Sequence, residues 1–249
     1  MKTAKVLGII PARLASTRLP GKPLLQIGGM PMIERVYRQV QKASCFSHFL
    51  VATDHQSIVD AVHSFGGTAV MTSSNHLNGT SRCAEVLSQI KDNYDLIINI
   101  QGDEPFIHPE LLNELAEWMM EKNADIGTCC REELEMSQIE KSSVVKVVLD
   151  QKQKALYFSR SVVPYYRDNT SESTLYLTHL GLYAFRSAIL PQLTTLPPSP
   201  LEQAEQLEQL RWLENGFSIY VKKTNHRSFS IDTPDDLQRA RDLIRLQGC

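Results

Sequence analysis

The sequence predicts an α/β protein with a Rossmann-like sandwich, and two observations carry this prediction. Short aliphatic runs alternate with helical patterns through the first half of the chain, and the first run, residues 6–10, is aliphatic apart from Gly8. A continuous apolar strand is typical of a parallel sheet covered on both faces. Alternating strands and helices then predict right-handed crossovers between parallel strands.

The elements of this first half follow in order. Pro31 opens a helix with apolar residues at three- and four-residue spacing, and Thr53 with Asp54 is expected to cap the next helix. Further strands are expected at 49–52, 68–71 and 96–100, and further helices at about 58–65, 80–90 and from 109 onward.

The alternation of strands and helices ends after about Cys130. Strand-like runs at 144–149, 155–158 and 175–185 have little helix between them. We therefore expect an antiparallel, strand-rich subdomain inserted at about 131–190 into a single domain of residues 1–249. A Pro-rich segment then precedes one helix with a leucine stripe from Leu201 to Leu213. A strand at 217–221 and a helix from Pro234 are expected to return to the main layer, the sheet and helices of the first half.

Composition limits the function. The chain has 249 residues, 42% hydrophobic and 22% charged, with a net charge of -2. These values argue against a broad nucleic-acid or membrane-surface footprint and favour a small-molecule partner. Neither a signal-peptide h-region nor an apolar run near the ~20 residues of a membrane span is visible, so a cytoplasmic protein is expected.

Cysteine and histidine patterns indicate no transition-metal site. The five cysteines form no C-x-x-C pair, and the seven histidines form no H-E-x-x-H pattern. Neither a disulfide framework nor a zinc site is indicated. Any metal is expected to have oxygen ligands.

The segment after the first strand is rich in cations. Pro11, Pro20 and Gly21 predict that the segment between the two prolines is neither helix nor strand and forms a loop at the carboxyl edge of the sheet. Arg13, Arg18 and Lys22 can converge there on one anion, because guanidinium and ammonium groups suit phosphate oxygens. The alternative is a solvated basic loop.

Two common phosphate loops are absent from this segment. Ser16 and Pro23 occupy the places where a Walker loop has glycine and a hydroxyl residue, and no G-x-G-x-x-G follows the first strand. Side chains are therefore expected to hold a nucleotide more than a helix terminus does.

Two acidic residues each follow an apolar segment and precede a turn or a helix. Asp103 follows the strand expected at 96–100, and Asp232 lies just before Pro234. The alternatives are a turn residue for Asp103 and a helix cap for Asp232.

Taken together, these stretches resemble the 3-deoxy-manno-octulosonate (Kdo) cytidylyltransferase family, also called CMP-Kdo synthetases. The likeness runs nearly end to end and rests on eight ordered motifs. They are I-P-A-R with S-T-R-L-P-G-K-P-L at 10–24, G-G-M-P-M-I at 28–33, V-A-T-D at 51–54, Q-G-D-E-P at 101–105, Y-F-S-R-S at 157–161, H-L-G-L-Y at 179–183, L-E-Q-L-R at 207–211 and I-D-T-P at 231–234.

The resemblance implies an enzyme that couples CTP and Kdo to give CMP-Kdo and pyrophosphate, activating Kdo for lipopolysaccharide biosynthesis. It also implies a nucleotidyltransferase α/β domain with a smaller dimerising insertion, hence a homodimer, and magnesium as cofactor. By the same resemblance, Arg13, Arg18 and Lys22 surround the triphosphate. Asp103 and Asp232 hold Mg²⁺.

The remaining implied contacts divide between the nucleotide and the sugar. Gln101 lies between the two substrates, and Arg82 contacts the nucleotide even though Ser81 stands where the family pattern has Asp. The residues implied to hold Kdo are Arg160, His179, Tyr183, Glu208 and Gln209.

Each sugar residue has a plainer interpretation. Without the resemblance, Arg160 is an exposed arginine at the end of a strand. His179 and Tyr183 are then core residues, and Glu208 and Gln209 belong to a solvated helix face. Other interpretations of the whole chain are a cytidylyltransferase for 8-amino-Kdo or a sialic acid, and a catalytically silent nucleotide-binding regulator.

Overall fold

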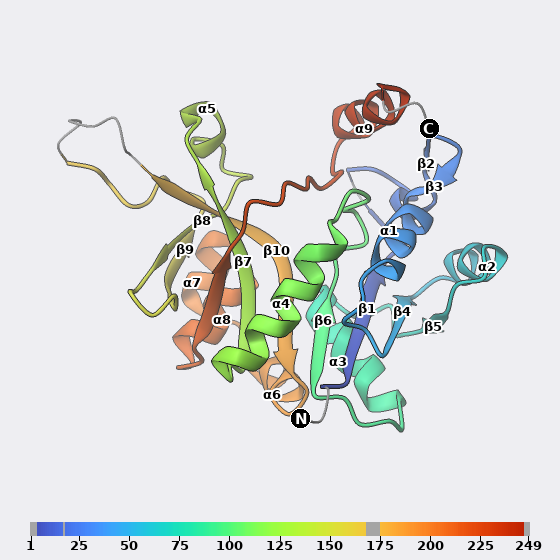
Figure 1. Ribbon diagram of the computed structural model, residues 1–249, viewed down its shortest axis with the longest axis horizontal. Coiled ribbons are helices and arrows are strands. Elements are labelled where there is room, and N and C mark those ends of the chain that lie inside the picture. The colour runs from blue at the N-terminus through green and yellow to red at the C-terminus, as the bar shows by residue number, and fades with distance from the viewer. Residues whose placement is uncertain (1–3, 17, 168–174, 247–249) are drawn as a thin grey trace. The chain divides into compact units, whose positions relative to one another are not determined.

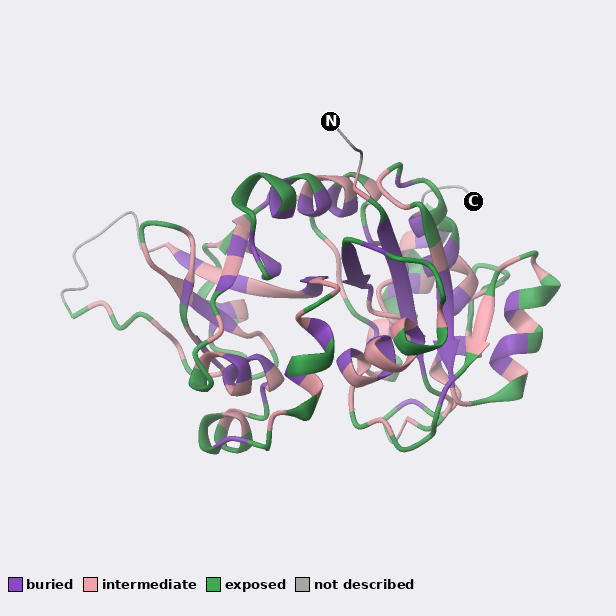
Figure 2. Cartoon of the chain, turned by 90° about the horizontal axis from the view of Figure 1, so that it is seen from below, coloured by how far each residue is buried: buried purple, intermediate pink, exposed green. Residues whose placement is uncertain are grey.

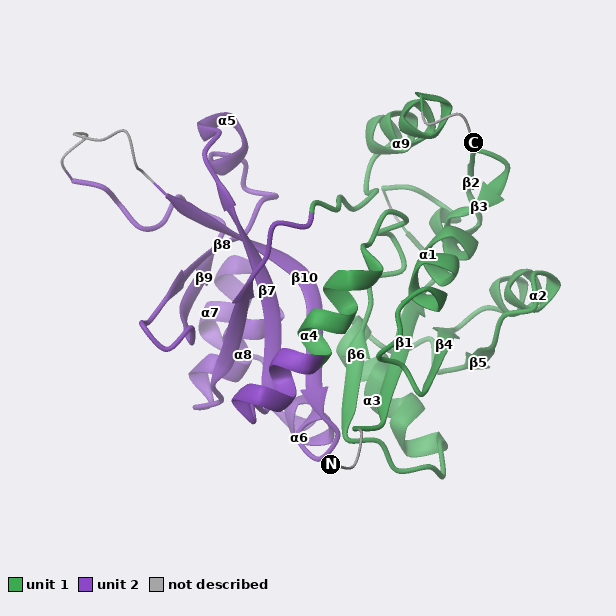
Figure 3. Cartoon of the chain, in the orientation of Figure 1, with its two compact units in different colours: residues 1–116, 227–249 green, residues 117–226 purple. Residues whose placement is uncertain are grey.

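The computed structural model describes residues 4–16, 18–167 and 175–246; Thr17 of the basic loop and Cys249 lie outside them. The chain forms two compact units, one of residues 1–116 and 227–249 and one of residues 117–226 (Figure 3). Helix α4 (Pro109–Lys122) contains the first boundary between them. The segment 131–190, expected as an insertion, falls within the second unit.

The first unit contains a parallel sheet with the strand order β6-β1-β4-β5 (Figure 1). The strands are β1 (Val6–Ala12), β4 (His48–Thr53), β5 (Ala69–Met71) and β6 (Leu96–Asn99). From β1 the chain moves outward to β4 and β5 and then returns to the other side of β1. The direction of winding therefore reverses between β1 and β6, which is where open α/β sheets bind ligands. The prediction of a Rossmann-like α/β fold is confirmed.

Three helices connect these strands, and right-handed crossovers place the first two on one face and the third on the other. They are α1 (Met32–Gln41), α2 (Gln56–Ser64) and α3 (Gly79–Gln89). Strands β1 and β6 are almost wholly buried between them, as Figure 2 shows. Full burial of each aliphatic side chain stabilises the fold by about 1.5–3 kcal/mol.

The C-terminal helix α9 (Pro234–Leu246) belongs to this first unit and packs on the segment after β1. That segment holds η1 (Lys22–Leu24) and the short pair β2 (Gln26–Ile27) and β3 (Met30–Pro31). The shared core consists of Leu19, Ile27, Met32, Ile231, Leu237, Ala240 and Ile244. This cluster packs the segment after β1 against α9 and the residues just before it.

Two local predictions in this unit are wrong. Strand β1 continues through Pro11 to Ala12, so the loop begins one residue later than predicted. The missing N–H of Pro11 is tolerated because the pairing of β1 with β6 ends at Ile9 and Asn99, so only β4 flanks the strand there. The cap of α2 is His55, whose Nδ1 accepts from the N–H of Ser57, while Thr53 is buried in β4.

The second unit is rich in strands, most of them antiparallel. They are β7 (Ile126–Glu133), β8 (Lys146–Leu149), β9 (Ala155–Ser159), β10 (Tyr176–Arg186) and β11 (Ile219–Lys223). Strand β10 pairs antiparallel with β7 and β8, and β8 with β9. Strand β11 pairs parallel with β7 and belongs to this unit, and the prediction that it joins the main sheet is confirmed by the strand order. Strand β7, which begins four residues before the expected end of the alternation, was not predicted.

The helices of the second unit are short: α5 (Met136–Ile139), α6 (Leu190–Thr195), α7 (Pro200–Glu205) and α8 (Glu208–Glu214). The single helix predicted from the leucine stripe is wrong, because Gln206 takes a left-handed conformation with φ 52° and separates α7 from α8. Leu207 and Leu210 are buried, whereas Leu201 is exposed. The buried part of the stripe therefore lies at the start of α8 and within it, and α7 has no buried residue. Among the helices described, none is both long enough and apolar enough to span a membrane.

Candidate functional site

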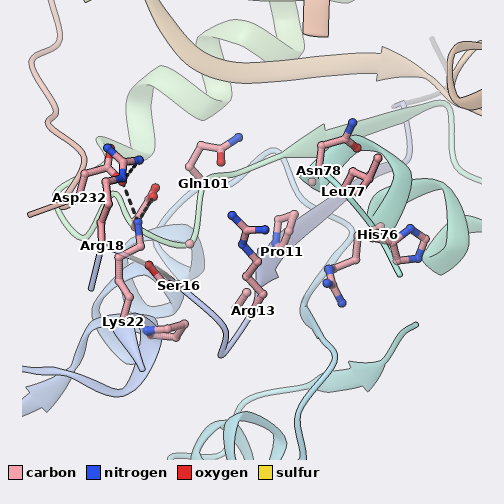
Figure 4. Close-up of a pocket in the computed structure, with 16 residues that line it drawn as sticks. Pro11, Arg13, Ser16, Arg18, Lys22, His76, Leu77, Asn78, Gln101 and Asp232 are labelled. Carbon is pink, nitrogen blue, oxygen red and sulfur yellow. Dashed lines mark hydrogen bonds and ion pairs between the residues drawn. The ribbon is translucent and has the colours of Figure 1, made fainter. Parts of the chain in front are cut away.

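A pocket of about 310 Å³ opens where β1 and β6 end, at the reversal point of the sheet (Figure 4). All of its lining residues belong to the first unit. They come from the end of β1 and the basic loop, the start of α3, the turn after β6 and the segment before α9: Pro11, Ala12, Arg13, Ser16, Arg18, Lys22, Pro23, His76, Leu77, Asn78, Gly79, Arg82, Gln101, Gly102, Asp103 and Asp232.

The basic loop brings its three cations to this pocket, as predicted. In the view of Figure 4, Arg18 and Lys22 lie on one side, His76 and Asn78 on the other, and Arg13 between them. Arg13 is exposed, and its guanidinium makes no hydrogen bond or ion pair with any described residue. Its donors are therefore available to an anion.

Lys22 connects the two predicted acidic residues. Its Nζ lies 2.6 Å from Oδ2 of Asp103 and 3.1 Å from Oδ1 of Asp232, so these carboxylate oxygens are no more than about 5.7 Å apart. Arg18 Nη2 also lies 3.1 Å from the same oxygen of Asp232. The sequence-based prediction that both aspartates face the basic loop is confirmed by this geometry.

The segments that carry the two aspartates are tied together next to the pocket. The N–H of Ile231 donates to the carbonyl of Asp103 (2.9 Å), and Ser228 Oγ donates to Glu104 Oε2 (2.9 Å). The rings of Phe106 and Phe229 stack with their centroids 5.3 Å apart. Burial, with the charge of Asp103 adding to it, raises the pKa of Glu104 to about 7, against the opposing hydrogen bond from Ser228.

Asp232 is not the cap of α9. Thr233 Oγ1 accepts from the N–H of Asp236 (3.2 Å), while Asp236 Oδ2 accepts from the N–H of Asp232 (3.1 Å) and of Thr233 (2.9 Å). This is a reciprocal capping arrangement in which Asp takes the place that Glu or Gln usually holds. The side chain of Asp232 is thereby left to Lys22 and Arg18.

Gly102 allows the turn after β6 to approach β1. A Cβ atom at this position would lie 2.6 Å from the carbonyl oxygen of Pro11, which is main chain and cannot move aside like a side-chain tip. Only glycine fits there, and this fit sets the position of Gln101 and Asp103 against the basic loop.

Arg82 lines the pocket and is 3% exposed. Its Nη2 lies 2.9 Å from Asp54 Oδ2, and its Nη1 donates to Thr72 Oγ1 (2.5 Å) and to the carbonyl of Ser73 (3.3 Å). The buried arginine thus has its counter-ion in Asp54. Sequence reasoning expected Asp54 only as a helix cap.

Ser81, which departs from the family pattern, belongs to a neighbouring network. His76 Nδ1 lies 3.1 Å from Ser81 Oγ, and His76 Nε2 hydrogen-bonds Glu85. Burial alone would raise the pKa of Glu85, but hydrogen bonds from His76 and the N–H of Ser73 outweigh it, so this pKa is lowered. Neither Arg82 nor His76 therefore needs an acid at position 81. The sequence analysis missed His76, Leu77 and Asn78, which no charge or glycine pattern marked.

The five residues predicted to hold the sugar all lie in the second unit. The guanidinium of Arg160 donates to three main-chain carbonyls. Its Nε donates to Glu205 (2.7 Å), its Nη1 to Ser142 (2.9 Å) and its Nη2 to Gln206 (3.3 Å). An arginine has five N–H donors, so two are left for a ligand. Arg160 is half-buried, and the plainer interpretation as an exposed strand end is wrong.

His179 and Tyr183 lie four residues apart on β10, with ring centroids 5.3 Å apart. His179 Nε2 lies 2.9 Å from Thr128 Oγ1, and burial lowers the pKa of His179 to about 3. Burial, with the charge of Glu208 adding to it, raises the pKa of Tyr183. The Tyr183 hydroxyl is buried and has no hydrogen-bond partner among the described residues. Both rings are neutral near pH 7.

Glu208 and Gln209 begin helix α8. Gln209 is buried and Glu208 is half-buried, so a solvated helix face does not describe them.

A carboxylate pair and a cationic loop at the reversal point of a parallel sheet define a nucleotide-binding α/β protein. The sequence pattern of the Cytidylyltransferase family matches residues 7–231. The chain is 47% identical over 245 residues to the 3-deoxy-manno-octulosonate cytidylyltransferase of Parabacteroides distasonis (95% of this chain, 96% of the relative). It is 46% identical to that of Fusobacterium nucleatum, with 97% of each chain covered.

Solved structures give the same result. The structure of CMP:2-keto-3-deoxy-manno-octonic acid synthetase complexed with CTP superimposes with a TM-score of 0.92 at 40% identity, covering 98% of this chain and all of that one. A cytidylyltransferase from Leptospira borgpetersenii has a TM-score of 0.65 at 18% identity, covering 98% of this chain and 87% of that one, and shares the fold. The chain belongs to the 3-deoxy-manno-octulosonate cytidylyltransferase family.

Proposed function

We propose that the protein transfers a cytidylyl group from CTP to Kdo, giving CMP-Kdo and pyrophosphate. The observation that carries this is the meeting of Asp103 and Asp232 on the ammonium group of Lys22, in the pocket that Arg13 also lines. Family membership supplies the substrates. The product of this reaction is Kdo activated for lipopolysaccharide assembly.

The residues fit a magnesium ion. A carboxylate 4 Å from a phosphate oxygen is repelled by about 4 kcal/mol at an effective dielectric of 20. Two aspartates beside a triphosphate are therefore unfavourable unless a cation lies between the carboxylates and the phosphates. No group of three or more His, Cys, Asp and Glu side chains that could hold a metal occurs among the described residues. An ion held by Asp103 and Asp232 would therefore complete its shell with phosphate oxygens and water, as Mg²⁺ commonly does.

In the reaction, the anomeric hydroxyl oxygen of Kdo bonds to the α-phosphorus of CTP. The bond from this phosphorus to the oxygen that bridges to the β-phosphate breaks, and pyrophosphate leaves. A magnesium ion held by Asp103 and Asp232 would polarise the α-phosphate and lower the pKa of the attacking hydroxyl, which loses its proton to water. Arg13, Arg18 and Lys22 neutralise charge on the triphosphate and on the leaving pyrophosphate.

The other assigned residues hold the substrates. Arg82, fixed by Asp54, supports the nucleotide side of the pocket, and Gln101 lies after β6 beside Gly102. Arg160 offers its two remaining N–H donors to the Kdo carboxylate. His179, Tyr183, Glu208 and Gln209 contact the sugar hydroxyls, with His179 acting as a neutral ring because burial lowers its pKa.

The assembly and location follow from the family likeness alone. We propose a homodimer in the cytoplasm, and sedimentation of the purified protein tests the first of these.

The decisive experiment is to measure pyrophosphate release from CTP with Kdo, 8-amino-Kdo and a sialic acid, each with and without Mg²⁺. Release with Kdo that depends on Mg²⁺ supports the proposal. Release with another acid sugar in preference to Kdo would identify a related transferase. A protein that binds CTP but releases no pyrophosphate with any sugar would be a silent regulator.

A further inference from the structure

Lys146 on β8 is a lysine that solvent does not reach: its exposed fraction is 0%. Lysine is almost never fully buried, because taking an ammonium group out of water is costly unless its donors are satisfied. The Nζ of Lys146 donates to the main-chain carbonyls of Val144 (2.7 Å), Lys141 (3.2 Å) and Arg160. These three bonds use all the donors that an ammonium group has.

Lys146 thus fixes the carbonyl of Arg160, and the side chain of Arg160 makes further contacts with main-chain carbonyls. Its guanidinium donates to carbonyls from two other segments, Ser142 on one side and Glu205 with Gln206 on the other. The loop 141–144 is therefore held twice, once by Lys146 and once by Arg160. Residues 205–206 lead directly into α8, where Glu208 and Gln209 begin the helix.

Glu205 is the acidic member of this cluster. Its carboxylate accepts from Ser159 Oγ (2.6 Å) and from the N–H of Arg160 (2.8 Å). Burial would raise the pKa of Glu205, but these hydrogen bonds and the charge of Arg160 lower it. Burial lowers the pKa of Lys146, against the opposing charge of Glu205. With one carboxylate for two cations, the cluster of Lys146, Arg160 and Glu205 has an excess of positive charge, which suits an anionic ligand.

We propose that Lys146 is a positioning residue of the acid-sugar site. By holding the carbonyl of Arg160 and the loop 141–144, it sets the direction in which the guanidinium presents its two remaining donors to the sugar carboxylate. This inference rests on the proposed function, in which Arg160 binds that carboxylate. Lys146 itself has no donor left for the ligand and acts only through Arg160.

The test compares Lys146→Met with Lys141→Met. The control lysine is exposed, and among the described residues its Nζ donates only to Gln138 Oε1 (2.8 Å). Pyrophosphate release gives KM for Kdo, KM for CTP and kcat for each variant. We expect Lys146→Met to raise KM for Kdo about tenfold or more, a change of about 1.4 kcal/mol, with KM for CTP within twofold of wild type. Lys141→Met should match wild type for both substrates.

A double-mutant cycle with Arg160→Ala separates positioning from general damage. If Lys146 acts through Arg160, Lys146→Met has no further effect on KM for Kdo when Arg160 is already absent. Where Lys146→Met does not fold, Lys146→Gln, which keeps two donors, supplies the same comparison. Equal rises in both KM values, an unchanged KM for Kdo, or an effect that persists in the Arg160→Ala background would overturn the inference. Wild-type protein that releases no pyrophosphate with Kdo would instead overturn the proposed function on which it rests.

Discussion

The ammonium nitrogen of Lys22 lies 2.6 Å from Oδ2 of Asp103, although 81 residues separate the two in the sequence. The same nitrogen contacts Asp232, which is 210 residues away. Lys22 thus holds two like-charged carboxylates close to each other. A residue of the basic loop therefore brings together the two carboxylates that we predict to hold a metal ion.

Asp103→Asn and Asp232→Asn should each lower kcat about 10²-fold, by analogy with the loss of one electrostatic stabiliser in an active site. Each amide keeps the shape of the carboxylate but carries no charge to hold a divalent ion. Steady-state pyrophosphate release over a range of Mg²⁺ concentrations measures the effect. Near-normal turnover of both variants at saturating Mg²⁺ would remove the metal assignment.

Gly102→Ala should lower kcat about 10²-fold while keeping the chemical groups of the site. The added Cβ, 2.6 Å from the carbonyl oxygen of Pro11, must displace the turn that carries Gln101 and Asp103, and displacements of about 1 Å carry a penalty of that size.

Gly66→Ala is the matched control for this substitution. Gly66 has φ 81°, and apart from its two chain neighbours no described residue has an atom within 4 Å of the position that its new methyl group would take. The change should therefore cost only about 1–2 kcal/mol of backbone strain and leave kcat unchanged. Equal kcat values for the two variants would contradict this account of Gly102.

Asp54→Ala should destabilise the protein by about 3–5 kcal/mol, because it leaves the buried guanidinium of Arg82 without its counter-ion. KM for CTP should also rise, since Arg82 lines the nucleotide pocket. Urea unfolding measures the first effect and initial rates the second. Asp242→Ala provides the comparison: its pair with Arg245 is exposed, with the charged atoms 3.8 Å apart, and should contribute no more than about 1 kcal/mol. A similar loss in both variants would show that burial of the Arg82 pair is unimportant.

The sequence predicted the parallel sheet, because buried strands require continuous apolar runs. It also predicted that the two aspartates face the basic loop, because parallel strands end at the same edge of the sheet. It did not predict the break at Gln206, since a left-handed residue other than glycine leaves no compositional mark. Nor did it predict the partner of Arg82. Asp54 stands after a strand and before a helix, and only the tertiary fold decides that it pairs with Arg82 instead of capping the helix.

His179 should make the stability of the protein depend on pH below about 6.5. Burial lowers the pKa of this histidine from 6.5 to about 3 in the folded protein. Between these values the unfolded chain takes up a proton that the folded protein does not, so stability is fully present above pH 6.5 and falls as the pH falls toward 3. For a half-buried ring, this amounts to about 1–2 kcal/mol between pH 6.5 and pH 5.

His179→Gln removes this ionisation while keeping a polar group within reach of Thr128. The free energy of unfolding of both proteins, measured with urea at pH 7.5 and pH 5, isolates the histidine, since every other titrating group is common to the two. Wild type should lose more stability than the variant between these pH values, whatever their difference at pH 7.5. Equal losses would mean that the ring takes up its proton as readily in the folded protein as in the unfolded chain. The sugar site would then contain a cation at pH 5, where we expect a neutral hydrogen-bonding group.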